Sequence, residues 1–154
     1  MTTTLTIEEL EHSGERDLGA SAWHDITQEQ VNMFADATGD HQWIHVDPDR
    51  AADGPFGGPV AHGYLTLAML PMLLSEVVSV SDAVMGVNYG TEKVRFTSPV
   101  PVGSRVRLHA KLARTERRGP SVIWTVGVQI EVEGKEKPAL VGEVVYMAAG
   151  APDA

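Results

Sequence analysis

The stretch that decides the fold is Tyr64-Leu-Thr-Leu-Ala-Met-Leu-Pro-Met-Leu-Leu-Ser-Glu-Val-Val78, which is apolar on nearly every side. A helix that is apolar all round has to be surrounded by protein, so this segment is predicted to be a long central helix. Pro71 lies in its middle and is expected to kink it. The wider apolar run from Val60 to Val80 is broken by Gly63, Pro71 and Glu76, which indicates a core helix rather than a membrane span.

Segments in which apolar and polar residues alternate follow this helix, and this period of two is typical of strands. Strands are predicted over residues 84–89, 93–96, 105–112, 122–132 and 140–147, with turns at 99–103, 114–120 and 133–138. Successive antiparallel strands and one helix that needs complete burial predict an α+β fold. In this fold the antiparallel sheet is wrapped around the helix.

The segment before the central helix contains two local helix signals. Residues 1–19 are expected to form a short helix and a connection, and residues 21–26 a short strand. Thr27 and Gln30 form a capping box for a helix that runs to Thr38, and Gly39 ends it. Asp47-Pro48 then begins a short helix that ends near Ala52, with Asp47 as its N-cap. A loop pinned at both ends is predicted between these helices.

Composition limits the functions that the chain can have. Its 154 residues suit one domain over 1–154, and the lack of cysteine excludes disulfides, thiol catalysis and cysteine-based metal sites. The first residues lack the pattern of a signal peptide, and we expect a cytoplasmic protein that neither spans nor binds a membrane. The net charge of −9 argues against binding to nucleic acid.

Positive charge is concentrated in one part of this acidic chain. Residues 1–92 hold 2 Lys/Arg and 15 Asp/Glu, whereas residues 93–118 hold 8 basic residues and one acidic residue. A local basic face suits a small polyanionic ligand better than a polymer. The alternative is that these side chains are simply the solvated sides of antiparallel strands.

The pinned loop carries the residues with the clearest chemistry, Asp40 and His45. A carboxylate and an imidazole this close in sequence can act together on one water molecule. Structural roles compete with this interpretation, because Asp after Gly often forms an Asx turn and a lone His is often a half-buried core residue. His41 and His62 add nitrogens for a metal, and the spacing of His41 and His45 fits one face of a helix, but this segment is predicted to be a loop, so no metal is expected. His62 is expected at the mouth of the site or in simple packing.

Thr38-Gly-Asp-His-Gln-Trp-Ile-His45 resembles the hydratase-2 motif of the MaoC-like, (R)-specific enoyl-CoA hydratases. Ala61-His-Gly63, Asn88-Tyr-Gly90 with Lys93-Val-Arg-Phe96, and Pro99-Val-Pro-Val-Gly103 are similar to that family in the same order. The resemblance covers about residues 20–148 and implies a single hot-dog domain. Two positions depart from the family pattern, because Gln42 and Trp43 stand where it has Asn and Pro.

The resemblance implies reversible syn addition of water to a trans-2-enoyl thioester, a hydro-lyase reaction of fatty acid metabolism. It places Asp40 and His45 on the water, the backbone N–H of Gly63 on the thioester oxygen, and Gln42 and Trp43 near the substrate. It also implies a homodimer and no cofactor, since coenzyme A or acyl carrier protein is part of the substrate. Basic candidates for the coenzyme A phosphates are Lys93, Arg95, Arg105, Arg107, Arg117 and Arg118.

Two other functions remain open at this point. A hot-dog thioesterase also binds acyl thioesters, but it typically directs water with a lone carboxylate, so the Asp40–His45 pair disfavours it. A non-catalytic acyl-thioester-binding subunit could use the same fold to dimerise, and the sequence does not distinguish it from an enzyme.

Overall fold

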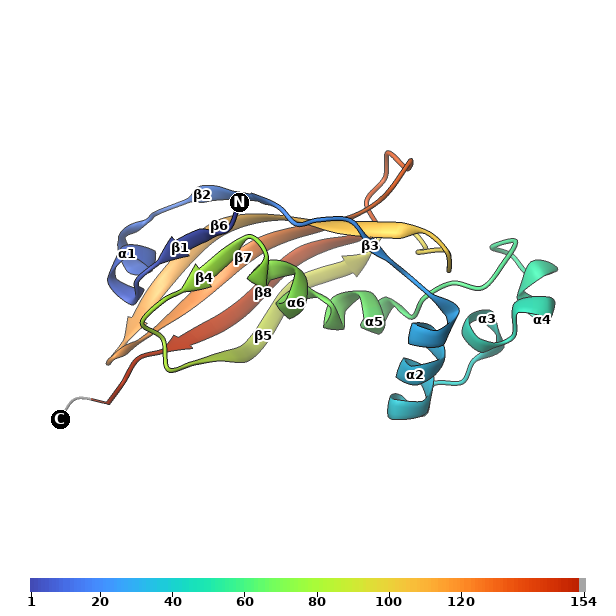
Figure 1. Ribbon diagram of the computed structural model, residues 1–154, viewed down its shortest axis with the longest axis horizontal. Helices are drawn as coiled ribbons and strands as arrows, with labels where there is room; N and C mark the ends of the chain where they lie inside the picture. Colours follow the sequence, from blue (N-terminus) through green and yellow to red (C-terminus); the bar gives the residue numbers. More distant parts are fainter. Residues whose placement is uncertain (153–154) are drawn as a thin grey trace.

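The computed structural model describes residues 1–152 and consists of a curved antiparallel sheet with two short helices against one face (Figure 1). The strand order is β2-β6-β7-β8-β5, and β3 also pairs with β6. The α+β fold predicted from the sequence is confirmed. The strands of this sheet are β2 (Arg16–Ala20), β3 (His24–Asp25), β5 (Met85–Phe96), β6 (Arg105–Arg118), β7 (Ser121–Val132) and β8 (Leu140–Ala149).

The central helix is two helices, α5 (Gly63–Ala68) and α6 (Leu70–Ser75), joined at Met69. The prediction of one long helix over 64–78 was wrong in length, because the chain breaks near Pro71 and the last residues enter a strand. The prediction that this segment is completely buried was also wrong for the single chain. Leu70 and Leu73 are buried, whereas Tyr64 is 69% exposed and Met72 is 43% exposed.

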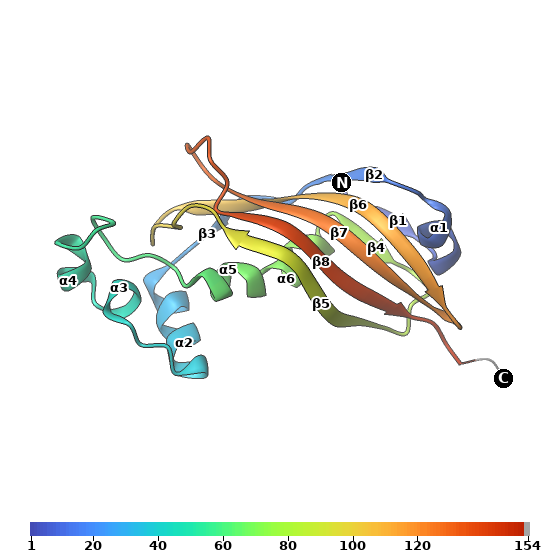
Figure 2. The same cartoon turned by 180° about the vertical axis from the view of Figure 1, so that it is seen from behind.

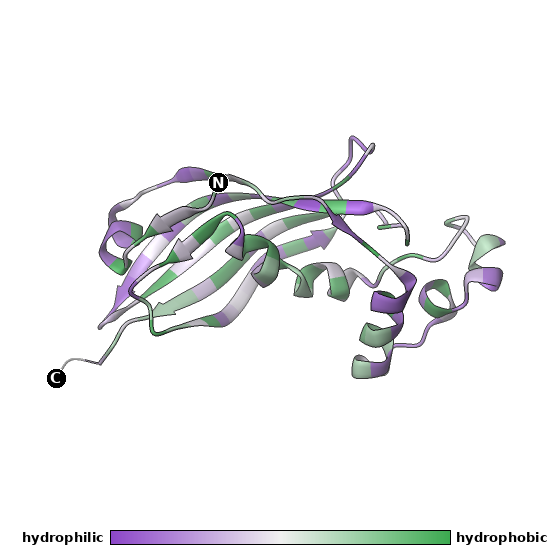
Figure 3. Cartoon of the chain, viewed as in Figure 1, coloured by the Kyte–Doolittle hydropathy of each residue, from purple (hydrophilic) through white to green (hydrophobic). Residues whose placement is uncertain are grey.

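Strand β7 buries the predicted set of alternating side chains, and in its first half Ile123 and Thr125 on the other face are buried as well. Every second side chain on one face, namely Val122, Trp124, Val126, Val128, Ile130 and Val132, is buried. Figure 3 shows alternating hydrophobic and hydrophilic residues along the strands of the sheet. These side chains belong to the same hydrophobic core cluster as Leu70, Leu73 and Leu74 of α6.

Two strands are longer than predicted. β6 continues through the turn expected at 114–120, and the chain reverses only at Gly119, which has a φ of 57°. β5 joins the segments 84–89 and 93–96 into one strand that carries register shifts between Asn88 and Gly90 and between Glu92 and Arg95. Exposed polar side chains obscure the period of two in both places, along the edge strand β5 and in the last residues of β6, 114–118, which are mostly exposed.

The N-terminal part contains the short helix expected within residues 1–19 and also strands that were not predicted. β1 (Thr3–Leu5) pairs in parallel with β4 (Val78–Val80), and α1 (Ile7–His12) follows β1. β2 lies within the segment expected to be a connection, whereas the strand predicted at 21–26 is reduced to the two residues of β3. The capping box at Thr6 and Glu9 explains where α1 begins.

Three helices, α2 (Gln28–Thr38), α3 (Trp43–Val46) and α4 (Pro48–Ala52), lie beyond one end of the sheet in both views (Figures 1 and 2). α2 and α4 have the predicted bounds, but the segment predicted as a loop contains α3, a single helical turn. Only half of the second capping box forms, since the Thr27 side chain accepts from the N–H of Gln30. Among the described helices, none is long and apolar enough to cross a membrane.

Candidate active site

Local hydrogen bonds hold the segment that carries Asp40 and His45. At the end of α2, Gly39 adopts the left-handed conformation with a φ of 81°, and its N–H donates to the carbonyl oxygen of Ala35. At the other end, the Asp47 side chain accepts from the N–H of Arg50 at 3.1 Å and caps α4. The segment is therefore pinned at both ends, as its sequence predicts.

His45 is buried, and its ring has a defined tautomer. The Nδ1 atom lies 2.6 Å from the carbonyl oxygen of Val60. A carbonyl oxygen only accepts, so Nδ1 carries a proton and donates it. In the neutral ring the lone pair is consequently on Nε2. Gln28 also donates to the backbone oxygen of His45 at 2.7 Å, which holds α3 against α2.

Asp40 is exposed and lies beside His45. One carboxylate oxygen of Asp40 accepts from the N–H of Gln42 at 3.4 Å, the contact of an Asx turn. The ligand atoms of Asp40, His45 and His62 all lie within 4.8 Å of one another. The fold therefore brings together the two residues that the sequence predicts to act as a pair. The exposed carboxylate of Asp40 and the Nε2 lone pair of His45 can therefore both contact the same small molecule.

Of the two roles expected for His62, packing is the one that the structure shows, because the side chain is buried with only 2% of its surface exposed and does not lie at the mouth of the site. Its Nε2 atom lies 2.9 Å from the backbone oxygen of Asp40, and its ring stacks on that of His45 with 3.9 Å between centroids. Sequence reasoning missed this role. The position of His62 directly before the first residue of α5 was the available signal.

The geometry of these three residues does not suit a metal ion. A metal held by an imidazole nitrogen lies about 2.1 Å from it and in the plane of the ring. The His45 and His62 rings stack with only 24° between their planes, so their lone pairs run side by side and do not converge. The arrangement is instead a carboxylate beside one imidazole, with a second imidazole stacked behind it.

Gly63 lies next to this cluster as the first residue of α5. Its N–H has no acceptor among the described residues, as is usual in the first turn of a helix. A Cβ atom at this position would lie 2.9 Å from the ring of Phe96, so this contact requires glycine. A pocket of about 320 Å³ lies beside it, lined by Ile44, Val60, Gly63 and Phe96 among others.

Gln42 and Trp43, the positions that depart from the family motif, have structural contacts. The backbone oxygen of Gln42 accepts from the N–H of His45 at 3.0 Å at the start of α3. The Trp43 ring lies 4.4 Å from the guanidinium of Arg50, and a Cβ at Gly54 would approach it to 2.9 Å. Trp43 therefore packs α3 on α4, and contact of either side chain with substrate stays a prediction.

Charge around the site is unevenly compensated. A hydrogen bond to Asp36 raises the pKa of His41, and the backbone of Gly39 and the charges of Asp36 and Asp40 add to this effect.

Among the basic candidates, ion pairs join Arg105 to Glu133, Arg107 to Glu131, Arg117 to Glu11 and Arg118 to Glu116. Lys93 and Arg95 have no carboxylate at ion-pair distance in the part of the chain that the structure describes.

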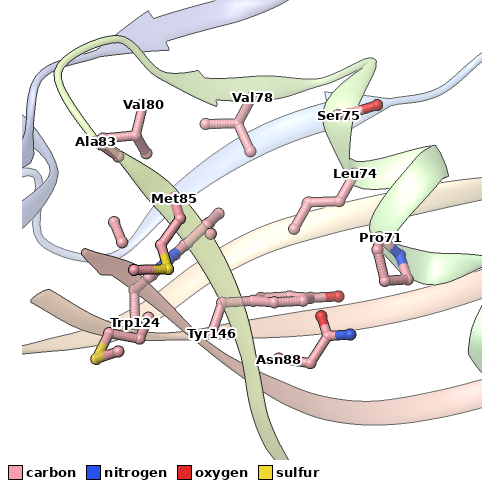
Figure 4. A pocket seen from close by; sticks show the side chains of 13 residues that line it. Pro71, Leu74, Ser75, Val78, Val80, Ala83, Met85, Asn88, Trp124 and Tyr146 are labelled. Carbon is pink, nitrogen blue, oxygen red and sulfur yellow. The ribbon is translucent and has the colours of Figure 1, made fainter.

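A second pocket, of about 290 Å³, lies along α6 and contains neither Asp40 nor His45. Figure 4 shows Leu74 and Pro71 above it and Trp124 and Tyr146 below it. Burial raises the pKa of Tyr146 to about 12. Neither pocket is lined by Asp40 or His45, but the pocket beside Gly63 is lined by Ile44 and Gly63, the chain neighbours of His45 and His62, whereas this second pocket is lined mostly by apolar side chains.

An antiparallel sheet that curves around helices, with a paired Asp and His at one end, defines the class of hot-dog hydratases. The MaoC like domain family matches residues 10–134, and the chain belongs to this family. The family expected from the sequence motif is therefore confirmed.

Individual relatives agree with this membership. The chain is 51% identical to "3-hydroxyacyl-thioester dehydratase Z" of Mycobacterium tuberculosis, over 94% of this chain and 97% of the relative. It is 46% identical to "Nodulation protein N" of Rhizobium meliloti, over 86% and 84% of the two chains. A solved (R)-hydratase from A. caviae has a TM-score of 0.72 and 26% identity, and covers 88% of this chain and 97% of its own.

Proposed function

We propose that this protein catalyses the reversible syn addition of water to a trans-2-enoyl thioester, with Asp40 and His45 acting on the water. The hydro-lyase class agrees with the family and with relatives named as dehydratases. The observation that carries the assignment of residues is the gathering of Asp40, His45 and His62 ligand atoms within 4.8 Å, next to Gly63. The (R) configuration of the product is expected from the A. caviae (R)-hydratase.

In the hydration direction, the oxygen of water forms a bond to Cβ while one of its protons passes to the Asp40–His45 pair. The electrons of the double bond move toward the thioester oxygen, where the N–H of Gly63 stabilises the developing negative charge. The electrons then return to Cα, which takes a proton from the same pair. Because one pair on one face gives and takes the proton, addition is syn.

Both members of the pair are suited to this exchange. The neutral imidazole of His45 presents the Nε2 lone pair, since its Nδ1 proton is held by Val60. The Asp40 carboxylate is exposed, and from residues 1–152 it accepts a single long hydrogen bond, from the N–H of Gln42 at 3.4 Å. We assign the proton to the pair as a unit, because two acceptors this close share the proton that water releases.

We expect the substrate to be an acyl thioester of coenzyme A or acyl carrier protein, and no separate cofactor. Coenzyme A carries a 3′-phosphate and a pyrophosphate, and the arm of acyl carrier protein is attached through a phosphodiester, so both carriers present phosphate that attracts cations. Lys93 and Arg95 on β5 fit this role better than the other basic candidates, because their charges are not neutralised within the described residues. The cytoplasmic location expected from the composition stays a prediction.

We also propose that the chain forms a homodimer through β5, which lies at the edge of the sheet. Large apolar side chains are exposed on β5 and on the adjoining residues, with Val84 at 60%, Met85 at 59%, Tyr89 at 57% and Phe96 at 44%. An edge strand leaves one row of N–H and C=O groups unpaired. A second copy of β5 would pair with these groups and cover Tyr64 and Met72.

The thioesterase alternative receives no support from the site, because His45 presents a nitrogen beside the carboxylate and the carboxylate does not act alone. A non-catalytic binding subunit would keep the same geometry. Turnover therefore has to decide between an enzyme and a binding protein.

The direct test is to mix the wild-type protein with crotonyl-CoA and longer trans-2-enoyl-CoA thioesters. Hydration removes the conjugated double bond, so ultraviolet absorbance should fall, and chiral analysis should show the (R)-3-hydroxyacyl product. Absence of turnover at every chain length, with both carriers, would contradict the proposed function and favour a binding subunit. Release of free thiol without loss of the double bond would favour the thioesterase.

A further inference from the structure

We infer that His62 is a positioning residue that holds Asp40 and His45 in their working arrangement, an inference that rests on the function proposed above. Two contacts connect it to the pair. Its Nε2 atom lies 2.9 Å from the backbone oxygen of Asp40, and its ring stacks on the ring of His45. With only 2% of its surface exposed, His62 is enclosed behind the pair and does not reach the substrate.

The stack completes the orientation of His45. The hydrogen bond from Nδ1 to the carbonyl oxygen of Val60 holds one atom of the His45 ring, but by itself it does not prevent the ring plane from tilting about this bond. The His62 ring, 3.9 Å away between centroids and tilted by 24°, removes that rotation. Phe34 contacts the His62 ring at 4.8 Å between centroids and thus supports the stack. The direction of the Nε2 lone pair of His45 is consequently fixed.

The hydrogen bond explains why this position is a histidine and not an apolar ring. Because a carbonyl oxygen only accepts, Nε2 of His62 carries a proton and donates it to Asp40. In the neutral ring, Nδ1 then has a lone pair, and it is buried without a partner in the described residues. A buried acceptor without a partner destabilises a fold, and phenylalanine would fill the space without that cost. The N–H that holds Asp40 is what histidine adds.

The same residue also precedes the proposed oxyanion donor. The backbone oxygen of His62 accepts from the N–H groups of Leu65 and Thr66 and so starts α5, in which Gly63 is the first residue. His62 therefore connects the backbone of Asp40, the imidazole of His45 and the N–H donor through one enclosed side chain and its own backbone. A residue with this role should affect the rate of the chemical step more than the binding of substrate.

Two substitutions separate the ring stack from the hydrogen bond. His62→Phe keeps a ring on His45 but loses the N–H, whereas His62→Gln keeps an N–H in reach of Asp40 but loses the ring. Each should lower kcat for crotonyl-CoA by about 10-fold to 100-fold, since small displacements of catalytic groups have effects of this size. KM should stay near the wild-type value, and the pH profile of kcat should shift in both variants.

The matched control is His24→Gln, a second histidine with a side-chain hydrogen bond, in this case to Glu76 at 2.6 Å, outside the candidate site. This variant should keep the kcat and the pH profile of the wild type. Wild-type kcat and pH profile in His62→Phe would overturn the role of the hydrogen bond. Losses that follow only the folded fraction, measured by circular dichroism, would make His62 a merely structural residue and overturn the proposal.

A readout without turnover separates this proposal from the proposed function. In nuclear magnetic resonance titrations, the His45 ring signals should move in the His62→Phe and His62→Gln variants and stay unchanged in His24→Gln. Unchanged His45 signals in both His62 variants would overturn the positioning role even if the enzyme is active. An inactive wild type with shifted His45 signals would instead overturn the hydratase assignment alone.

Discussion

Strand β7 and the segment α2–α4 use their residues in opposite ways. In β7 the inward side chains from Val122 to Val132 are buried apolar groups that hold the sheet together. In α2–α4 most side chains are exposed, and the segment lies beyond the end of the sheet, where it carries Asp40 and His45 (Figures 1 and 2). Changes in β7 should therefore act on stability, and changes at the site should act on turnover.

The largest effect is expected from changing the reacting pair. Asp40→Asn removes the acceptor charge, and His45→Gln removes the lone pair on Nε2, so each should lower turnover by about 100-fold to 10,000-fold. The melting temperature should change little for Asp40→Asn, because that side chain is exposed and makes one long hydrogen bond. Hydration of crotonyl-CoA and thermal unfolding by circular dichroism measure the two effects.

Asp36→Asn serves as the control for this prediction, since Asp36 is a highly exposed carboxylate near the end of α2, and its side chain contacts His41. It should keep near-normal turnover. Near-normal turnover in Asp40→Asn or in His45→Gln would show that the residue in question does not act on the water. A large loss in Asp36→Asn would show that local charge, and not the pair, governs the rate.

The opposite result is expected in β7. Ile130 is fully buried, and Ile130→Ala should lower the free energy of unfolding by about 2–5 kcal/mol, the usual cost of such a cavity. Gln129→Ala, at the neighbouring exposed position, should change it by less than about 0.5 kcal/mol. Urea unfolding measures both, and turnover per folded molecule should stay at the wild-type value. A selective loss of turnover in Ile130→Ala would contradict the separation of roles.

The sequence predicted those features that depend on neighbouring residues. Gly39 and the Asp47-Pro48 pair set the ends of α2 and α4 through local backbone chemistry, and the alternation in β7 follows directly from burial on one face. Asp40 and His45 were found because both lie within one short motif. The family and its hydro-lyase chemistry followed from that motif.

Features that depend on distant contacts could not be predicted in the same way. His62 is 17 residues from His45 in the sequence, and only the fold brings their rings into contact. α3 forms where a loop was expected, because Trp43 packs against Arg50 and Gly54 of the following segment. Ion pairs such as Arg107–Glu131 join different strands, so a basic run in the sequence gave no sign of which charges are neutralised.

β5 does not fit the division between a sheet that gives stability and a site that gives turnover, because it is a strand of the sheet whose side chains are mostly exposed. Tyr89→Glu would place a charge on each copy of the proposed interface and should weaken the dimer by about tenfold or more. Met33→Glu is the matched control, since Met33 is 59% exposed and Tyr89 is 57% exposed. In sedimentation velocity over a dilution series, Tyr89→Glu should dissociate to monomer at concentrations at which the wild type and Met33→Glu remain dimeric. A wild type that is monomeric at all concentrations would contradict the dimer.

The smallest effect is expected at Tyr146 of β8, where burial raises the pKa of the phenol from 10.0 to about 12. Between these values the unfolded chain releases the proton and the folded chain keeps it, so this contribution to stability is complete below pH 10 and is lost as the pH rises toward 12. Tyr146→Phe removes the titrating group, so its unfolding free energy should fall less than that of the wild type from pH 9 to pH 11. Urea unfolding at about these two pH values measures the difference. Equal losses in both proteins would show that Tyr146 titrates as it does in the unfolded chain, and that the hollow along α6 is more open to water than the packing around Trp124 and Leu74 indicates.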